Sequence, residues 1–578
     1  MRMRVGSLEA LQTEGRLLAK AGGHGVCVFW HEGRAYALDD RCPHLGFPLH
    51  RGTVEAGLVT CHWHHARFDL ATGGTLDPFA DDARAFGVDI EGDDVFLVVD
   101  PPDDRVEHLR RRLEEGLEGG LTLVMAKAVL GLLEADVAPA EIVRVGVEFG
   151  TANRAQGWGS GLTVLVAMAN LLPFLDEADR GAALVHGLAF VARDTANRPP
   201  RFPLTPLGDG SPASSAVPSE RLAGWYRRFV DTRSGDAAER TLVTALSAGT
   251  DAPTVSELMT AAVTDHVFID VGHTLDFTNK AFEAVEHLGW ESATTILPTL
   301  TGQTAGASRS EEGSRWRHPH DLVWLVTSTE GRLPALLAEG RSRAGAFSDV
   351  SGLGWQMLED DPYSVVASIC DAIAAGATPE QLGRALAFAA ALRITRFHTQ
   401  NDFGDWDSVH HGFTYANALH QSLVRHPSDL LVRGVVHGAL RVYLDRFLNV
   451  PAARLPAAEG AEEPDLAELQ QCWDAQGGVD RAGGIAYRWL RTGGHPRQLV
   501  AVLGHALLAE DAGFHWFQIV EASVRQFAAW PEGSEEGALI LAGAARFLAA
   551  HTPTRRELPH VVRTAARLRR GDDLFEES

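Results

Sequence analysis

The feature that most constrains this chain is a spaced set of two cysteines and two histidines. Cys42-Pro43-His44 is followed, after 16 residues, by Cys61-His62-Trp63-His64. Two thiolates and two imidazoles at fixed spacing predict a metal site. Tetrahedral zinc accepts such a set, but the single residue between Cys42 and His44 is tight for a zinc finger. A [2Fe–2S] cluster with two cysteines on one iron and two histidines on the other suits the spacing better.

Short β-strands are predicted around these ligands. Residues 25–38 and 86–99 each read as two apolar segments joined by a polar, glycine-containing turn, and residues 54–61 form a shorter pair. Hairpins of this kind predict a small antiparallel sandwich or barrel.

With these strands around its ligands, the N-terminal segment resembles the Rieske iron–sulfur family. The resemblance runs through Cys42–Leu49, Gly52–Val54, Cys61–Leu70 and Gly73-Gly74, and covers about residues 1–100. It implies an antiparallel β domain with Cys42 and Cys61 on the inner iron and His44 and His64 on the outer, solvent-facing iron. A structural zinc site is the alternative.

Departures from the Rieske pattern indicate a subtype. Respiratory, high-potential members carry an extra cysteine in each loop, joined as a disulfide, where this chain has Phe47 and Trp63. They also use a serine and a tyrosine as hydrogen-bond donors, where this chain has Ala66 and Phe68. Fewer donors stabilise the reduced cluster less, so the resemblance implies a ferredoxin or oxygenase type at the low end of the Rieske potential range.

Composition limits the class and the partners. A chain of 578 residues exceeds one hydrophobic core, so at least two domains are expected. The net charge of −24 argues against nucleic acid and anionic membranes as partners. Five cysteines cannot form a disulfide framework, and neither an apolar leader nor a membrane-spanning run is found. We therefore expect a cytoplasmic protein with no membrane partner.

At the acid-flanked pair Pro101-Pro102, the hydrophobic pattern changes from that of short strands to that of helices. We expect a multidomain chain: a β Rieske domain over 1–100, a linker over 101–108, and a large all-α, histidine-rich candidate catalytic domain over 109–578. Short similarities between 184–188, 435–439 and 503–507 suggest repeated helical hairpins. Helices are predicted over 109–117, 121–133, 162–175, 182–192, 255–287, 365–375, 380–393, 408–424, 431–447, 498–509, 514–527 and 538–550.

The helical part carries 18 of the 25 histidines, several of them one turn from an acid. A helix over 255–287 would place His266, Asp270 and His273 on one face. Helix-borne carboxylate and histidine pairs hold non-haem iron or di-iron sites in helical bundles. The predicted ligands of a second metal site are His266, Asp270, His273, His398, Asp402, His411, His505 and His515. Asp407 with His410, and Asp511 with His515, show similar spacings.

Each of these assignments has a structural alternative. Asp–His pairs one turn apart also occur as hydrogen-bonded core pairs or helix caps. Tyr415 is a candidate catalytic proton donor to bound oxygen, and the alternative is a buried, hydrogen-bonded structural tyrosine.

These observations predict an iron–sulfur oxidoreductase. A separate NAD(P)H-dependent flavin reductase or ferredoxin reductase would reduce the cluster, because the chain shows no nucleotide-binding motif of its own. The cluster would pass electrons to non-haem iron or di-iron in the helical domain, which would oxidise a small organic substrate with O2 as a monooxygenase or dioxygenase. The acid-x-x-His-x-x-x-x-His iron motif of familiar Rieske oxygenases is absent. The alternative is a redox-gated binding or carrier protein, in which the cluster is only a relay or sensor.

Overall fold

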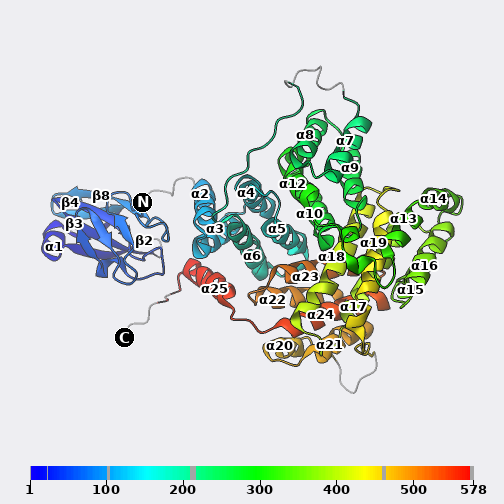
Figure 1. Ribbon diagram of the computed structural model, residues 1–578. Coiled ribbons are helices and arrows are strands. Elements are labelled where there is room, and N and C mark those ends of the chain that lie inside the picture. The colour runs from blue at the N-terminus through cyan, green and yellow to red at the C-terminus, as the bar shows by residue number, and fades with distance from the viewer. Residues whose placement is uncertain are drawn as a thin grey trace. The chain divides into compact units, whose positions relative to one another are not determined.

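The computed structural model describes residues 2–21, 24–99, 105–208, 217–457, 464–572 and 574, without the side chains of His24 and Phe403. The chain forms two compact units (Figure 1). One comprises Met1–Val145 with Leu558–Ser578, and the other comprises Gly146–Glu557. Residues 101–104 of the predicted linker lie outside the described residues, whereas 105–108 form the first turn of a helix.

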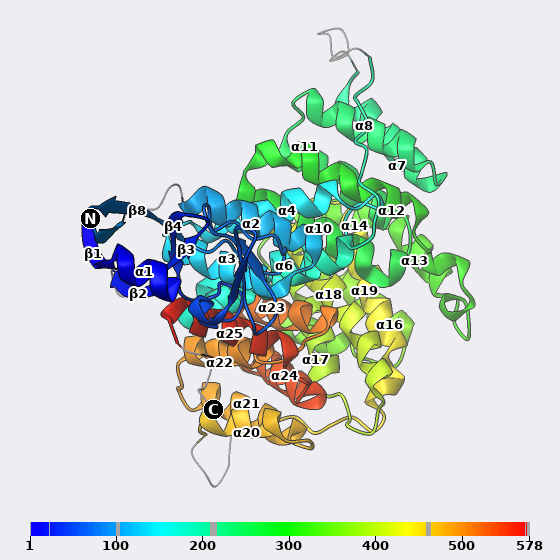
Figure 2. The same ribbon diagram turned by 90° about the vertical axis from the view of Figure 1, so that its left-hand side faces the viewer.

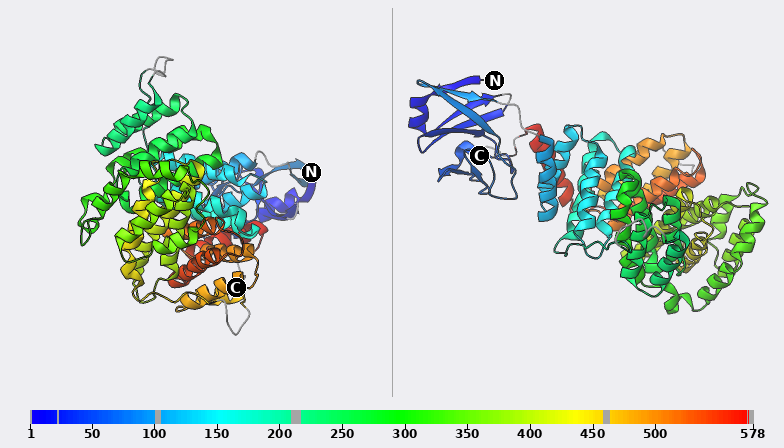
Figure 3. Two further views of the ribbon diagram at one scale, coloured as in Figure 1. Left: turned by 90° about the vertical axis from the view of Figure 1, so that its right-hand side faces the viewer. Right: turned by 90° about the horizontal axis from the view of Figure 1, so that it is seen from above.

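The first unit contains two antiparallel sheets, drawn in blue in Figure 3. The larger sheet has the strand order β1-β9-β8-β4-β3-β2 and the smaller has the order β5-β6-β7. The hairpins predicted over 25–38 and 86–99 are confirmed as β3–β4 and β8–β9. The strands, with the short helix α1 (Leu8–Glu14), are β1 (Arg2–Ser7), β2 (Arg16–Ala21), β3 (His24–His31), β4 (Arg34–Asp39), β5 (Thr53–Glu55), β6 (Leu58–Thr60), β7 (Arg67–Asp69), β8 (Ala85–Glu91) and β9 (Asp94–Val98).

Strand β3 divides the core of the β part into two layers. Cys27 and Phe29 lie in one buried cluster, whereas Val26 and Val28 lie in the other. This alternation follows from the two-residue period of a strand, whose successive side chains point to opposite faces. The cluster that contains Cys27 and Phe29 also contains Cys42 and Cys61, so this layer supports the cysteine–histidine loops.

Helices form the remainder of the described chain, as predicted. The first unit includes α2 (Arg105–Gly119) and α3 (Thr122–Glu134). The helices used below are α5 (Ser160–Leu171), α6 (Glu177–Thr195), α9 (Ala252–Thr264), α10 (His273–Leu288), α18 (Phe403–Arg425), α19 (Arg433–Leu444), α22 (Pro496–Leu508), α23 (Phe514–Phe527) and α24 (Glu535–His551). Within the described residues, no helix is long and apolar enough to cross a membrane.

The centre of the second unit is built from four helices that lie side by side (Figure 1), three of which, α10, α18 and α23, are also labelled in Figure 2. Helix α18 packs against α10 and α23, and both of these pack against α5. The helices α10 and α23 are amphipathic but carry ionisable residues on their buried faces, including Lys280 and Glu521. Polar side chains are thereby brought into the interior of the bundle.

The predicted helix over 255–287 is wrong, because the chain breaks into α9, a short 3-10 turn (Ile269–Gly272) and α10. Phe268, Asp270 and Val271 all have positive φ, so His266, Asp270 and His273 do not share one helix face. The backbone groups in the break are held by a distant segment. The Asp270 N–H donates to the Ser308 carbonyl at 2.8 Å, and the Val267 N–H donates to a Glu311 carboxylate oxygen at 3.0 Å.

Candidate metal centres

The cysteine–histidine motif forms two loops with the same backbone geometry. The Cys42 N–H donates to the carbonyl five residues later, and the N–H four residues later donates back to the Cys42 carbonyl, both at 2.8 Å. Cys61 repeats this pattern at 2.8 and 3.0 Å. The residues that close the loops, Gly46 and His65, have φ of 85° and 61°. Such tight turns present several backbone N–H groups to the loop interior, which favours anionic ligands.

The two sulfur atoms lie close together and are buried. Cys42 is 3% exposed and Cys61 is 1% exposed. A hydrogen bond from the Cys42 thiol and the backbone N–H groups of Trp63 and His64 lower the pKa of Cys61 to about 6, against the opposing effect of burial. A thiol held in this way loses its proton readily, which is the form that binds iron or zinc.

The two motif histidines lie beside each other. The ring centroids of His44 and His64 are 4.8 Å apart, and the rings are nearly perpendicular. Burial, His64 and Lys127 lower the pKa of His44 to about 4, so its imidazole is neutral at pH 7. The buried Nδ1 atom of His44 has no hydrogen-bond partner among the described residues. Two adjacent sulfurs and two adjacent imidazoles, one with an unused nitrogen, fit a [2Fe–2S] cluster.

The residues that indicate the subtype lie close to the two cysteines. Ala66 and Phe68 are fully buried in the cluster of side chains that contains both cysteines. Phe47 and Trp63 lie opposite each other, with ring centroids 6.1 Å apart. The place of a loop-bridging disulfide is therefore taken by an aromatic contact, and no hydroxyl is present at positions 66 and 68.

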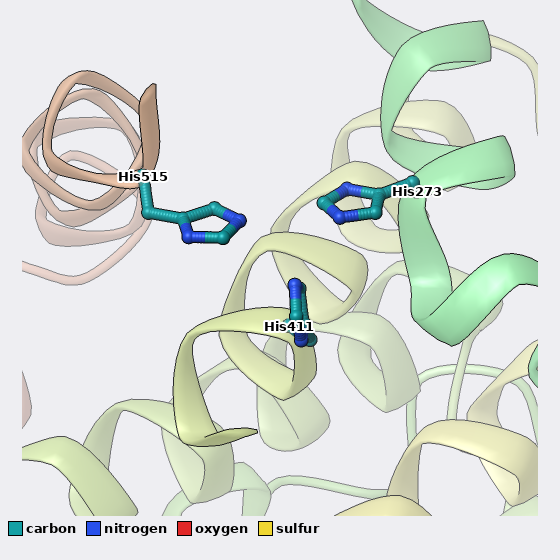
Figure 4. A group of neighbouring side chains, drawn as sticks. All are labelled: His273, His411 and His515. Carbon is teal, nitrogen blue, oxygen red and sulfur yellow. The ribbon is translucent and has the colours of Figure 1, made fainter. Parts of the chain in front are cut away.

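A second candidate centre lies in the helical unit, where three predicted ligands converge. His273 begins α10, His411 lies on α18, and His515 is the second residue of α23. Figure 4 shows their rings around a common space between the three helices. One nitrogen of each lies within 4.8 Å of the others. His273 and His515 are stacked at 5.7 Å, and His411 is perpendicular to both at 4.7 and 4.8 Å. We call His273, His411 and His515 the trihistidine group.

The trihistidine group is uncharged at neutral pH. Burial and the neighbouring rings lower the pKa of His273 to about 4 and that of His411 to about 2. Burial also lowers the pKa of His515, against the opposing effect of Asp407. Neutral imidazole is the form that binds a metal. His273 Nδ1 and His515 Nε2 are buried and have no hydrogen-bond partner among the described residues. The group therefore offers unused nitrogen lone pairs in the protonation state that ligation requires.

Asp407 and His410 extend the trihistidine group on one side. Asp407 Oδ1 lies 3.2 Å from His515 Nδ1 and 3.5 Å from His410 Nδ1. Together with His515 they form a second set of three ligand atoms within 4.8 Å of one another. The sequence showed the spacing of Asp407 and His410, but neither was among the predicted ligands. They reach the site because Asp407 contacts His515 on α23, which is 108 positions away in the chain.

The break before α10 sets the position of His273. Gly272 has a φ of 102°, and a side chain there would lie 3.2 Å from the His411 carbonyl and 3.1 Å from Tyr415 Cβ. Glycine therefore lets the start of α10 approach α18 closely. The preceding left-handed conformation at Val271 is costly for a β-branched residue, by about 1–3 kcal/mol. Such strain is typical of segments that hold a functional side chain in place.

The other predicted ligands lie apart from the trihistidine group. His266 Nδ1 pairs with Glu311 at 2.9 Å, and His505 Nδ1 pairs with Asp179 at 3.0 Å. Asp402 caps α18, and His398 accepts a hydrogen bond from the Gln400 N–H at 3.2 Å. The carboxyl of Asp270 has its pKa raised by burial. His266 and His505 are thus paired with acids on distant segments, and Asp402 lies at a helix cap.

The predicted catalytic residue Tyr415 is engaged in the packing of two helices. It is buried on α18, and its hydroxyl donates to the Gly434 carbonyl on α19 at 3.1 Å. Burial raises the pKa of its hydroxyl well above the usual value. These contacts match the alternative of a buried structural tyrosine. The sequence alone did not distinguish a catalytic proton donor from a structural tyrosine at this position.

Comparison with known proteins identifies the N-terminal part. The Rieske [2Fe-2S] domain family matches residues 2–87. Human apoptosis-inducing factor 3 is 41% identical over 73 residues, which cover 12% of this chain and 12% of that protein. The chain therefore spans only a small part of that relative.

Two further matches are bacterial ferredoxins. The ferredoxin component of the 2,4-dinitrotoluene dioxygenase system of Burkholderia sp. (strain RASC) is 34% identical over 77 residues, which cover 13% of this chain and 74% of that protein. The solved ferredoxin of carbazole 1,9a-dioxygenase from Nocardioides aromaticivorans IC177 is 25% identical, with a TM-score of 0.17, and the match covers 17% of this chain and 99% of that one. With its two ligand loops and its match over most of a ferredoxin component, this chain belongs to the Rieske [2Fe–2S] family.

Proposed function

We propose that this protein is an oxidoreductase in which a Rieske cluster supplies electrons to a non-haem metal bound by the trihistidine group. The metal would oxidise a small organic substrate with O2. The observation that carries the proposal is the convergence of three neutral imidazoles, those of His273, His411 and His515, in a chain that has an electron-transfer domain. His273 and His515 each offer a buried nitrogen without a hydrogen-bond partner among the described residues.

The residues of the Rieske domain would hold and tune the cluster. Cys42 and Cys61 would bind one iron, and His44 and His64 the other. The cluster supplies one electron at a time when bound. Ala66 and Phe68 give the protein no hydroxyl to stabilise added charge, which favours a low potential and hence a strong donor.

Because the proposed electron donor is a Rieske cluster, the metal bound by the trihistidine group should be redox-active. Three imidazoles suit zinc, copper, iron or nickel. Zinc has no redox chemistry in proteins, so a cluster would have no use for it as an electron acceptor. Iron with three protein ligands retains open positions for substrate and O2. The trihistidine group has the partial exposure that such exchange requires, since all three residues are intermediate between buried and exposed. Asp407 and His410 would add ligand atoms for a second ion, as in a di-iron site.

A cavity near these histidines is a candidate substrate site. It has a volume of about 540 Å³ and is lined by Asn401, Asp402, Trp406 and His551 among others. Trp406 and His551 also pack on His410, with ring centroids 6.3 and 6.1 Å away. The volume suits a small organic molecule. A lining that includes both polar side chains and an indole favours a substrate with both aromatic and polar parts.

The electrons would come from a separate reductase. The dioxygenase ferredoxin that this chain resembles is named as one component of a larger system. A NAD(P)H-dependent flavin reductase or a ferredoxin reductase is the corresponding partner here. The acidic net charge of −24 favours a partner with a basic docking face.

Two single substitutions test the proposal by separating its two centres. His64→Ala should remove the Rieske absorption and spin signals but leave the metal of the helical unit bound. His411→Ala should do the reverse, with the cluster intact and the additional metal lost. Both variants should lose reductase-driven O2 consumption. If His411→Ala keeps the wild-type metal content and O2 consumption, the trihistidine group is not the acceptor, and the cluster acts as a relay or sensor alone.

A further inference from the structure

Beyond the trihistidine group, α10 and α23 share a second feature, a series of buried polar contacts. We call this series the ladder; its members are Asp276, Gln518, Lys280, Glu283, Glu521 and Asn170. Three residues after His273 comes Asp276, and three residues after His515 comes Gln518. The Gln518 side-chain amide donates to the Asp276 carboxyl, and both residues are 1% exposed. Three helical residues rise about 4.5 Å. This contact therefore lies about one helical turn below the histidines.

Below that contact, an ammonium group bridges two buried carboxylates. Lys280 Nζ lies 2.8 Å from Glu283 Oε2 and 2.8 Å from Glu521 Oε2, and each of the three side chains is 1% exposed. The Asn170 amide, from α5, donates to the same two carboxylates at 2.7 and 2.8 Å. Four helix-borne side chains are thus joined without an exposed member.

The ladder reaches solvent through two arginines. Arg525, on α23, lies 3.3 Å from Glu283, and Arg425, on α18, lies 3.7 Å from the same carboxylate. Arg425 also pairs with Glu286 at 2.5 Å, and the Glu286 side chain is 53% exposed. Ionisable groups therefore occur from the surface inward to Asp276, which lies one helical turn before Lys280 on α10 and about one turn from His273.

The charges of the ladder leave one carboxyl able to exchange a proton. Asp276 faces Lys280 and Glu283 on its own helix and Gln518 and Glu521 on α23, while Asn170 on α5 is uncharged. Arg425 on α18 and Arg525 on α23 face the same group of carboxylates. Burial raises the pKa of Asp276 to about 7, against the opposing effect of Lys280.

Glu283 contrasts with Asp276. Burial alone would raise the pKa of Glu283, but the positive charges of Lys280 and Arg525 outweigh this effect and lower that pKa to about 2. Of these two carboxyls, Asp276 is therefore the one that gains and loses a proton near neutral pH. Burying this many ionisable groups adds little stability, because desolvation offsets the attraction between them. A role in moving protons explains why such a ladder lies beside a redox site.

We propose that Asp276, Lys280, Glu283 and Glu521 form a proton relay that supplies the trihistidine centre, with Asp276 as the last donor. This inference rests on the proposed function and adds to it the route of the protons. Monooxygenation of a substrate takes two electrons and two protons per O2 and releases one water, whereas reduction of O2 to two waters without substrate takes four electrons and four protons. The reductase, or dithionite in the test below, would reduce the cluster again after each one-electron transfer. With each electron, one O–H bond of Asp276 would break and its proton would pass to oxygen, leaving the Asp276 carboxylate. Glu521 and Lys280 then return a proton from the solvent side.

The test uses the full-length protein, reduced with dithionite and mixed with O2 in the absence of substrate. Reoxidation is followed by absorbance from pH 6 to 9, in H2O and in D2O. In wild type, we expect the rate to fall above about pH 7, as Asp276 loses its proton. We expect a solvent isotope effect of about 2 or more, because proton transfer contributes to the barrier.

Asp276→Asn keeps the size and polarity of the side chain but cannot donate an acidic proton. We expect about 100-fold slower reoxidation, with no pH dependence near 7 and with unchanged metal content and cluster spectrum. The matched control is Glu510→Gln, another carboxylate that is 1% exposed in the same unit and pairs with Arg556. It should reoxidise like wild type.

The outcomes separate the relay from the proposed function. If His411→Ala reoxidises as fast as wild type, the trihistidine centre is not the acceptor, and both proposals are wrong. If His411→Ala is slow but Asp276→Asn matches wild type in rate and pH profile, the centre stands and the relay is wrong. If wild type shows neither a pH dependence near 7 nor an isotope effect, the relay is also wrong, whatever the stability of the Asp276 variant.

Discussion

His515 Nδ1 and Asp407 Oδ1 lie 3.2 Å apart, although the two residues are 108 positions apart in the chain. The contact joins α23 to α18 and decides which nitrogen of His515 carries hydrogen, because a carboxylate accepts and does not donate. Nδ1 therefore donates, and the lone pair remains on Nε2, which has no hydrogen-bond partner among the described residues. Carboxylates that hold histidines in this way orient the ring and make it a stronger metal ligand.

The first prediction follows from that contact. Asp407→Asn should weaken metal binding at the trihistidine group by about 10- to 100-fold, because a neutral amide orients and polarises the imidazole less well. Chelator competition on cluster-intact protein measures the affinity. Asp429→Asn, which removes a carboxylate paired with Arg341 at the surface, serves as the control. Equal affinities for all three proteins would contradict the assigned role of Asp407.

The second prediction concerns the potential of the cluster. Ala66→Ser and Phe68→Tyr each place a hydroxyl in the buried layer beneath the cysteines. A hydroxyl that donates toward the cluster stabilises the added electron, so each change should raise the midpoint potential. A hydrogen bond stronger by about 1 kcal/mol in the reduced state corresponds to about 40 mV. Protein-film voltammetry measures the shift, and Ala66→Cys is a comparison of similar size with a weak donor. Unchanged or lower potentials for both hydroxyl variants would refute this argument.

The third prediction concerns stability in acid. Burial lowers the pKa of His186 to about 4, and its side chain is fully buried on α6. Below the ordinary histidine pKa of about 6.5, the unfolded chain binds a proton that the folded chain does not. The free energy of unfolding should therefore fall as the pH drops from about 6.5 to 4, by about 3 kcal/mol from this group. His186→Gln should flatten the dependence in urea titrations.

His505 provides a control with the opposite sign. Its hydrogen bond to Asp179 raises its pKa, so its contribution to stability is present below about pH 6.5 and is lost as the pH rises through the raised value. His505→Gln should therefore lower stability at pH 6 and leave the acid limb of the curve in place. An acid limb that is identical in wild type and His186→Gln would contradict the assignment to His186.

Local patterns account for what the sequence predicted well. The four predicted cluster ligands lie within two short loops, so their spacing in the chain reflects their spacing in space. The helix predicted over 514–527 agrees with α23 because its apolar residues face α5 and α18 continuously. Where the signal is local periodicity or loop spacing, one sequence suffices.

Distant contacts account for what the sequence did not predict. Val267 and Ile269 continue the apolar spacing of α9, yet Ser308 and Glu311 take the backbone N–H groups that a helix would use. The members of the trihistidine group are each more than 100 positions apart in the chain, and no local pattern distinguishes His411 and His515 from His398 and His505. The burial of Asp276 and Lys280 likewise depends on helices from distant parts of the chain that pack against α10.

The metal stoichiometry of the purified protein tests the central claim most directly. Iron and acid-labile sulfide are measured on the same samples of wild type and His411→Ala. The account predicts two sulfides and at least three irons per wild-type chain, and two sulfides with two irons in the variant. Two irons in both proteins would contradict the second centre, and stoichiometric zinc without sulfide would contradict the Rieske cluster itself.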